Sequence, residues 1–298
     1  MSLIAILISL FLERTMSSLR EYRKFGWFDQ YTDKVLVWGR DRGWRGPGIV
    51  LLILAGPLLG VVLINTLFDD ALLGLLALAF NTLVLFLCLG PKDLEQQVEQ
   101  FFAAWELEDD EQARLAAEEI LGEKPPEALS ELQSVMTEKL LLESTERLLA
   151  PIFCFSLFAM LGAGPFGVVL YRLSCQLQHR YEEQSDEFTA AVKRLYAILG
   201  WLPAHVIALL FAMAGSFVDA IQQWRERSPA WRDDWQKAVS GAVLAGGLGA
   251  LQAQPVSEQD VSPDDIPSRL RSVMGLVLRS VVILIVLIAI ITLTLFGD

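Results

Sequence analysis

From Gly48 to Phe68 the chain runs GIVLLILAGPLLGVVLINTLF, a stretch without a charged residue. Spanning the ~30 Å hydrocarbon core of a bilayer takes about 20 predominantly apolar residues, because an α-helix rises ~1.5 Å per residue. Residues 71–90 form a second uncharged run, and Asp69 and Asp70 separate the two. Carboxylates are costly at the bilayer centre, so the pattern predicts a tight hairpin of two membrane-spanning helices with these aspartates at its turn.

Residues 280–296, SVVILIVLIAIITLTLF, supply a third stretch of this kind, and Arg271 and Arg279 lie on its amino-terminal side. This arrangement predicts a carboxyl-terminal transmembrane anchor at residues 279–298.

Two further apolar stretches contain helix breakers. Residues 148–171 include Pro151 and a Gly-Ala-Gly-Pro interruption, and residues 195–218 include Pro203. Each stretch is long enough to span with a kink, and each is equally compatible with a re-entrant hairpin. The first apolar run, residues 1–12, is short and lacks a basic amino-terminal region and a small-residue cleavage site, so we interpret it as a retained helix and not as a signal peptide.

The composition supports a membrane protein. Of 298 residues, 53% are hydrophobic and 20% are charged, and the mean hydropathy is +0.43. The formal net charge of −12 argues against a nucleic-acid partner, because such a partner requires a basic surface. The basic loop at residues 13–47 is expected on the cytoplasmic side of a bacterial inner membrane, by the positive-inside rule, and the carboxyl terminus outside. We therefore predict an all-α, polytopic integral membrane protein.

Nearly the whole net negative charge lies in one loop. Residues 91–147 carry 16 acidic residues against 5 basic ones, and the apolar residues of 93–105 recur with the period of a helix. An Asp-Asp-Glu group begins a second predicted helix after Leu107, Gly122 ends it, and Pro126 suits the start of a third. The loop is either a solvated acidic helical hairpin or a docking surface for a cytoplasmic protein partner.

The predicted organisation has five regions. They are an amino-terminal helix, basic loop and transmembrane hairpin at 1–90, the acidic cytoplasmic helices at 91–147, the two broken apolar segments at 148–218, cytoplasmic amphipathic and small-residue helices at 219–278, and the anchor at 279–298. Within the fourth region a Gly-Gly-Leu-Gly run at 246–249 lacks the strand or the terminal lysine of a phosphate-binding loop. We interpret it as a surface for close helix packing.

Residue types for catalysis are scarce. The three cysteines and two histidines share no metal-ligand spacing, so we predict neither a metal site, a cofactor nor a catalytic residue. Arg147 and Arg172 bracket the broken segment that begins near Pro151, and His205 follows Pro203 inside an apolar stretch. Charges beside broken helices can bind anions, so these five residues form our predicted site for a small anionic ligand. Snorkelling of charged ends at the membrane surface is the alternative for the two arginines.

Five segments in this order resemble the AmpE family, bacterial inner-membrane proteins linked to the regulation of β-lactamase induction. They are LISLFLER at 7–14, FLCLGPKDL at 86–94, ERLLAPIFCFSLFAMLGAGPFGVVLYR at 146–172, LYAILGWLPAHVIALLFAMAGSFVDAIQQW at 195–224 and RSVVILIVLIAIITLTLF at 279–296. The AmpE family in turn resembles the adenosylcobinamide-phosphate synthases of cobalamin biosynthesis, membrane enzymes that form an amide bond at the expense of ATP.

The resemblance to the synthases is partial. Ala150-Pro151 with Phe153 matches an Ala-Pro-x-Phe core, Tyr171-Arg172 matches the end of the same segment, and Pro203-Ala204 matches the start of a Pro-Ala-Arg motif. His205 stands where that motif has arginine, residues 174–177 (Ser-Cys-Gln-Leu) replace Asn-Thr-Leu-Asp, and residues 122–125 (Gly-Glu-Lys-Pro) replace Gly-Arg-Asp-Thr.

These replacements remove groups suited to magnesium and phosphate. The resemblance therefore implies a regulatory or sensory membrane component that signals cell-wall or β-lactam stress, and not a catalyst. Two alternatives stay open: an ATP-dependent amide-forming synthase of the cobinamide type, and a structural or assembly partner of another membrane protein.

Overall fold

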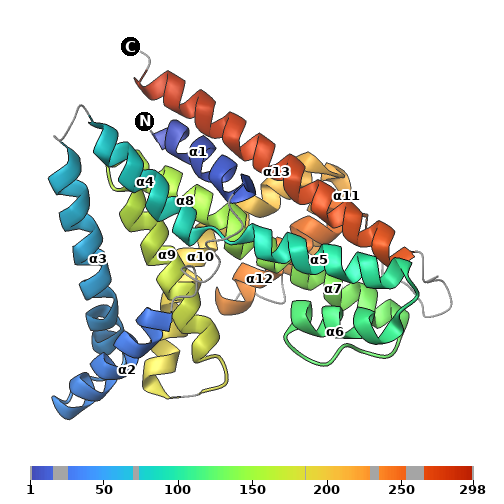
Figure 1. The fold of residues 1–298 in the computed structure, drawn as a ribbon, viewed down its shortest axis with the longest axis horizontal. Coiled ribbons are helices and arrows are strands. Elements are labelled where there is room, and N and C mark those ends of the chain that lie inside the picture. The colour runs from blue at the N-terminus through green and yellow to red at the C-terminus, as the bar shows by residue number, and fades with distance from the viewer. Residues whose placement is uncertain are drawn as a thin grey trace. The chain divides into compact units, whose positions relative to one another are not determined.

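A computed structural model describes residues 2–15, 26–69, 74–184, 186–228, 235–252 and 265–296. The described chain is all-helical, which confirms the predicted fold class. It divides into two compact units (Figure 1). Unit 1 comprises Met1–Leu89, Ala150–Pro203 and Ile288–Asp298, and unit 2 comprises Gly90–Leu149 and Ala204–Leu287. Each unit is therefore assembled from segments that lie far apart in the sequence.

Unit 1 has an apolar core that four of its helices share. It contains α1 (Ser2–Thr15), α2 (Gly26–Asp41), α3 (Pro47–Asp69), α4 (Leu75–Cys88), α8 (Ala150–Ala159), α9 (Gly164–Arg180) and the first part of α10 (Glu187–Ala214). Leu36 of α2, Ile53 of α3, Leu173 of α9 and Val192 of α10 are all buried in the same cluster. The core thus joins α2 and α3 to residues more than a hundred positions later in the chain.

Three helices in the described part of the chain are long and apolar enough to cross a membrane. They are Pro47–Phe68 in α3, Glu187–Ala214 in α10 and Asp265–Thr294 in α13 (Asp265–Phe296). The first and third contain predicted spans. The anchor was expected to begin at residue 279, but its helix already begins at Asp265, because no glycine cap or other stop signal interrupts the residues before Arg279.

The second predicted span, 71–90, needs correction. The described helix α4 has 14 residues, about 21 Å at ~1.5 Å per residue, and is too short to cross a ~30 Å core unaided. It ends at Cys88 because Leu89 is extended and Pro91 begins the next helix. It does contact α3, as the predicted hairpin requires, although Asp70 of the predicted turn lies outside the described residues.

The two broken apolar segments have different structures. Residues 148–171 do not form one helix, because α8 ends at Ala159 and α9 begins at Gly164, and these two helices pack against each other. Residues 195–218 belong mostly to α10, which continues through Pro203 to Ala214. Of the alternatives that the sequence left open, a single kinked span fits the second segment, whereas the first is a helical hairpin.

Unit 2 contains the acidic region. Its helices are α5 (Pro91–Glu106), α6 (Asp110–Leu121), α7 (Leu129–Ser144), a π-helix (Thr145–Leu149), the end of α10, α11 (Phe217–Arg227), α12 (Trp235–Ala250) and most of α13. Asp109 caps α6 by accepting a hydrogen bond from the backbone N–H of Gln112, and Gly122 ends α6 in the left-handed conformation, as the sequence predicts. The third helix begins at Leu129, three residues beyond Pro126.

Candidate functional site

The break between α7 and α8 is a π-helix over Thr145–Leu149. Such segments are rare and occur frequently at functional sites. Pro151 follows it and has no N–H to donate to the carbonyl of Arg147, four residues earlier. That carbonyl instead accepts a hydrogen bond of 3.1 Å from the backbone N–H of Gly90. A residue at the start of α5 therefore satisfies the polar group that the proline leaves open.

Three charged side chains, spaced four residues apart, line one face of this region. The ammonium of Lys139 lies 3.3 Å from one carboxylate oxygen of Glu143, and the guanidinium of Arg147 bonds the other oxygen. The Glu143 residue is only 9% exposed, and these two cations offset the cost of burying a carboxylate there. Arg147, predicted as an anion ligand, is therefore held in a fixed position by a buried partner that the sequence analysis did not assign to the site.

The other predicted ligand residues are divided between the units. Pro151 on α8 and Arg172 on α9 belong to a packed pair of helices in unit 1, and Pro203 ends the part of α10 that belongs to that unit. Arg172 is half-buried and lies within electrostatic range of the thiol of Cys88 on α4. Arg147 and His205 belong to unit 2.

His205 packs against an aromatic side chain that the sequence analysis did not single out. Its ring centroid lies 5.2 Å from that of Trp224 on α11, and the two rings meet edge to face. The sequence around Trp224, a tryptophan among polar residues, indicated an amphipathic helix but nothing about its neighbour. One side of the His205 ring therefore packs against a neighbouring helix.

The glycine run of α12 is a packing surface, as predicted. A Cβ on Gly246 would lie 2.7 Å from the Cα of Ala208 on α10, and a Cβ on Gly247 would lie 2.8 Å from Leu141 on α7. A Cβ on Gly249 would lie closer still to the backbone of Ala220 on α11. Since these small faces are already covered within unit 2, they lend no support to an assembly role with another membrane protein.

The acidic region contains a small cavity between α5, α6 and the chain that precedes α7. Its volume is about 170 Å³, and Phe101, Trp105, Arg114 and Leu132 are among its lining residues. Pockets for ligands of drug size have volumes of roughly 300–1,000 Å³. The cavity is therefore too small for a nucleotide or a corrinoid.

The described residues do not fit a resident divalent metal. Among them, no group of three or more histidine, cysteine, aspartate or glutamate side chains is placed to hold an ion. The positions where the synthases have their Asn-Thr-Leu-Asp motif are also packing positions here. Ser174 and Cys175 are buried, and the Ser174 hydroxyl donates to the carbonyl of Tyr171 at 2.7 Å.

The described part of the chain is all-helical and contains three helices long and apolar enough to cross a membrane, which are the features of a helical membrane protein. Comparison with protein families then identifies the family within this class. Residues 2–256 match the family described as CobD/Cbib protein, and the chain belongs to that family.

Two curated relatives carry the name cobalamin biosynthesis protein CobD. The protein from Stutzerimonas stutzeri (strain A1501) is 28% identical over 214 residues, which are 70% of this chain and 66% of the relative. The protein from Chromobacterium violaceum is 32% identical over 99 residues, 32% of this chain and 30% of the relative. The chain thus spans slightly less than two thirds of the first relative's length. No solved structure matches the chain.

The family match corrects the sequence analysis. Identification as an AmpE protein was wrong, and with it the predicted regulatory role in β-lactamase induction or cell-wall stress signalling. The segments that carried the resemblance are mostly apolar, and apolar helix sequences are constrained by the bilayer more than by function. Ala150-Pro151, Tyr171-Arg172 and Pro203-Ala204 were shared by both families, so they could not separate them.

Proposed function

We propose that this chain is a membrane-bound enzyme of cobalamin biosynthesis, of the adenosylcobinamide-phosphate synthase type, which forms an amide bond at the expense of ATP. The observation that carries the proposal is the family match over residues 2–256. The names of the two relatives, both cobalamin biosynthesis proteins, support it.

The reaction needs an activated carboxyl group. A carboxylate oxygen attacks a phosphorus atom of ATP, the P–O bond to the departing nucleotide breaks, and an acyl phosphate forms. The amine nitrogen then attacks the acyl carbon and loses a proton, the C–O bond breaks, and phosphate leaves. Both steps concentrate negative charge on phosphate oxygens, so arginine and lysine side chains that are already held in place would favour them.

Arg147 and Lys139 suit that role in unit 2, because the buried carboxylate of Glu143 fixes both cations. Arg172 offers a second guanidinium in unit 1, in the Tyr171-Arg172 pair near the middle of α9. The residues present do not fit a magnesium site, so no step is assigned to a protein-bound metal. Any metal in this reaction would arrive with the nucleotide.

We propose the location of a multi-pass protein of the bacterial inner membrane, with the acidic region in the cytoplasm. Three helices able to cross a membrane support a multi-pass arrangement. The basic residues between the first apolar run and α3 favour a cytoplasmic position for that segment. ATP is a cytoplasmic substrate, so this orientation would place the acidic region and the nucleotide in one compartment.

Nucleotide binding tests the proposal directly. Purified protein in detergent is titrated with ATP by calorimetry, with and without magnesium, and we expect saturable binding. The variant Arg172→Ala should express normally and lose the ATP-induced rise in melting temperature, whereas Arg194→Ala, an exposed arginine of α10, should keep it. A charge-assisted hydrogen bond contributes about 1.5–3 kcal/mol, so the affinity for ATP should fall about tenfold or more.

Two outcomes would contradict the proposal. Absence of ATP binding under both conditions would exclude the synthase activity. A large fall in the melting temperature of Arg172→Ala without ATP would show that this arginine is structural. A strain that lacks its own synthase of this type provides the functional check, because the chain should restore corrinoid-dependent growth there and Arg172→Ala should not.

A further inference from the structure

Helix α2 has a buried face and an exposed face of different character. Phe28, Thr32, Leu36 and Gly39 lie at spacings of three and four residues and are buried in the core of unit 1. The opposite face carries Trp27, Lys34, Val37 and Trp38, all exposed, and we call it the tryptophan face. Trp27 is 55% exposed, Val37 63% and Trp38 45%. Two tryptophans and a valine exposed on one face make it a candidate surface for contact with a membrane or a partner.

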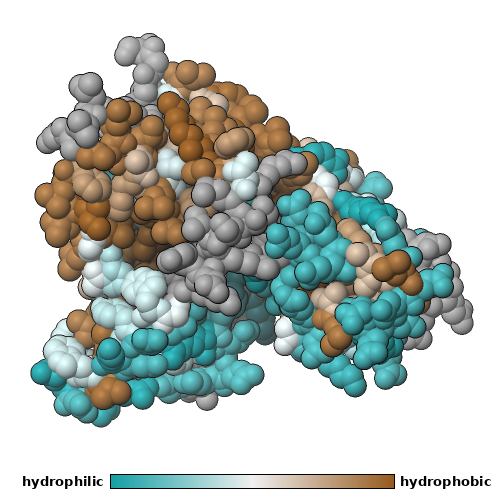
Figure 2. Space-filling model, viewed as in Figure 1, coloured by the Kyte–Doolittle hydropathy of each residue, from teal (hydrophilic) through white to brown (hydrophobic). Residues whose placement is uncertain are grey.

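The path of the chain places this face at the edge of the membrane. Only residues 42–46 separate α2 from α3, a helix able to cross a bilayer. They turn tightly, because the backbone N–H groups of Arg42 and Trp44 both donate to the carbonyl of Gly39, at 3.1 and 3.0 Å. The end of α2 is therefore held beside the end of a membrane-spanning helix. Figure 2 agrees, since the hydrophobic surface along α3 gives way to hydrophilic surface where α2 lies.

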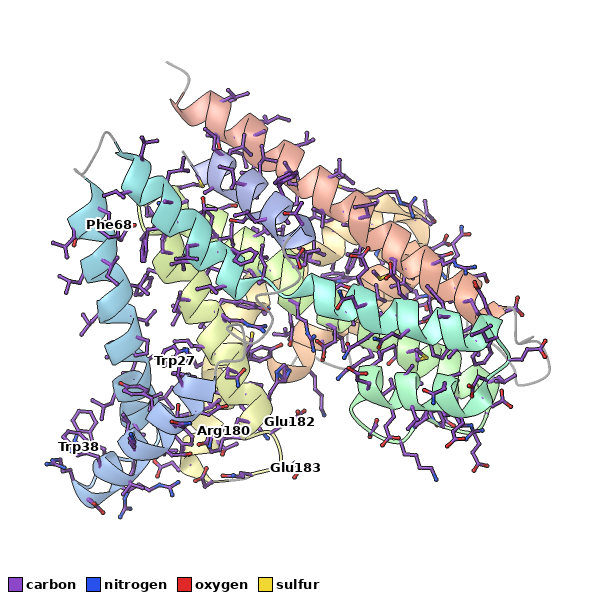
Figure 3. All side chains as sticks on the ribbon, viewed as in Figure 1. Trp27, Trp38, Phe68, Arg180, Glu182 and Glu183 are labelled. Atoms are coloured by element: carbon purple, nitrogen blue, oxygen red, sulfur yellow. The ribbon has the colours of Figure 1, made fainter. Side chains whose placement is uncertain are left out.

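The net charge of α2 and the turn that follows it is positive, since residues 26–47 carry four basic and three acidic side chains. Arg180 of α9 bonds both carboxylate oxygens of Asp33 at 2.8 Å and lies 3.3 Å from Asp29, so it offsets one of these two negative charges of α2. Figure 3 shows Arg180 next to α2. Arg40 of α2 pairs with Asp186. Within residues 26–47 the other basic side chains, Lys34, Arg42 and Arg45, outnumber Asp41.

The arginine at the end of the helix also contacts a tryptophan. The guanidinium carbon of Arg42 lies 3.9 Å from the ring centroid of Trp38, and Trp44 is exposed in the same turn. Tryptophan is enriched at the level of lipid headgroups, where the ring is amphipathic, and nearby lysine and arginine attract anionic headgroups. Aromatic and cationic groups are thus adjacent on one exposed surface.

We propose that the tryptophan face of α2, together with Arg42 and Arg45, binds the membrane surface through anionic phospholipid headgroups. The helix presents Trp27, Val37 and Trp38 to the boundary between headgroups and acyl chains, and its basic residues hold lipid phosphates. This inference rests on the geometry of unit 1 and is independent of the enzymatic proposal.

The test uses the full chain with a fluorophore that reports polarity at position 37. Val37→Cys is labelled, and the native cysteines Cys88, Cys154 and Cys175 are buried. Leu115→Cys, an exposed position on α6, is the matched control. The protein is reconstituted into phosphatidylcholine vesicles that contain a minor fraction of phosphatidylglycerol, with brominated chains on either lipid. We expect blue-shifted emission at position 37 only, and stronger quenching by brominated phosphatidylglycerol than by brominated phosphatidylcholine.

A variant that lacks two of the arginine charges distinguishes binding to anionic lipid from contact with other partners. In Arg42→Gln/Arg45→Gln the preference for phosphatidylglycerol should fall about fivefold for each charge removed, with the blue shift retained. Aqueous emission at position 37 in vesicles would overturn the proposal. Equal quenching by the two lipids would overturn its anionic part. A blue shift that appears already in detergent and grows with protein concentration would assign the face to a second copy of the chain and would also overturn it.

Discussion

The two proline-containing apolar segments differ in the capping groups that accompany their prolines. In the first, α8 ends in a left-handed glycine, Gly162, with φ of 74°. The N–H of Ala163 bonds the carbonyl of Phe158, and the N–H of Gly162 bonds that of Ala159, the pattern of a Schellman cap. Pro165 then suits the start of α9. The first segment therefore contains both the residues that end one helix and a proline suited to begin the next.

The second segment has no such stop near its proline, because its glycine and serine, Gly215 and Ser216, lie between the end of α10 and the start of α11. Pro203 removes one hydrogen bond from α10, yet the helix continues for 11 more residues to Ala214, because no glycine with positive φ follows the proline. Helix α10 ends beside α12, where a tertiary hydrogen bond replaces the helical one. The N–H of Ser216 donates to the carbonyl of Ala250 on α12, at 2.9 Å. The comparison shows that proline alone does not end a helix here, whereas a capped glycine or a tertiary hydrogen bond does.

The largest expected loss of stability comes from a variant that forces α10 and α12 apart. Gly246→Leu would place a side chain where the backbone of Ala208 lies at 2.7 Å, and backbone cannot yield as a side chain can. Overpacking of this kind should lower the free energy of unfolding by about 3 kcal/mol. Thermal unfolding in detergent, followed by circular dichroism, measures it. Gly275→Leu on α13 is the control, since nothing lies within 4 Å of its Cβ position. Equal melting temperatures for the two variants would refute the packing role.

A smaller effect is expected at the turn of the first segment. Gly162→Val forces a β-branched residue into the left-handed conformation, which should cost about 1–2 kcal/mol. Ala163→Val, one residue later at φ of −121°, should cost much less and serves as the control. The measurement is the difference in melting temperature between the two variants. If both behave alike, the glycine conformation does not determine the break.

The smallest effect concerns the start of α11. Asp219 accepts hydrogen bonds from the hydroxyl of Ser216 and, at 3.0 Å, from the amide of Gln252, and these bonds hold its pKa below the ordinary value of 3.8. A lowered folded-state pKa contributes stability above the unfolded pKa that is lost as the pH falls through the folded pKa. Wild type should therefore be more stable than Asp219→Asn at neutral pH.

The pH dependence identifies the cause of that difference. As the pH falls below about 4, Asp219 becomes protonated and the advantage of the wild type over Asp219→Asn should disappear. The check is a series of melting curves at decreasing pH, with Glu226→Gln on α11 as a control at an exposed carboxylate. A difference that persists unchanged at the lowest pH would mean that the ionised carboxylate does not stabilise this junction.

The sequence identified individual residues of the candidate site but not the side chains that contact them. Arg147 was identified from its position beside a broken segment, but the buried partner that fixes it, Glu143, is recognisable only once a helix brings residues four apart together. The contact of His205 with Trp224 joins two different helices and leaves no trace in either local pattern. Function was predicted wrongly because apolar segments resemble one another across membrane protein families.

The sequence by itself determined the helical class, the long span of α3, the acidic helices with the cap at Asp109 and the stop at Gly122, and the packing role of the α12 glycines. These features depend on local chemistry: apolar run length, capping residues and side-chain size. Only the tertiary structure decided that α10 runs through Pro203, that Gly90 satisfies the carbonyl of Arg147 and that α2 turns its tryptophans outward. Each of these depends on a hydrogen-bond partner or a packing surface that lies far away in the sequence.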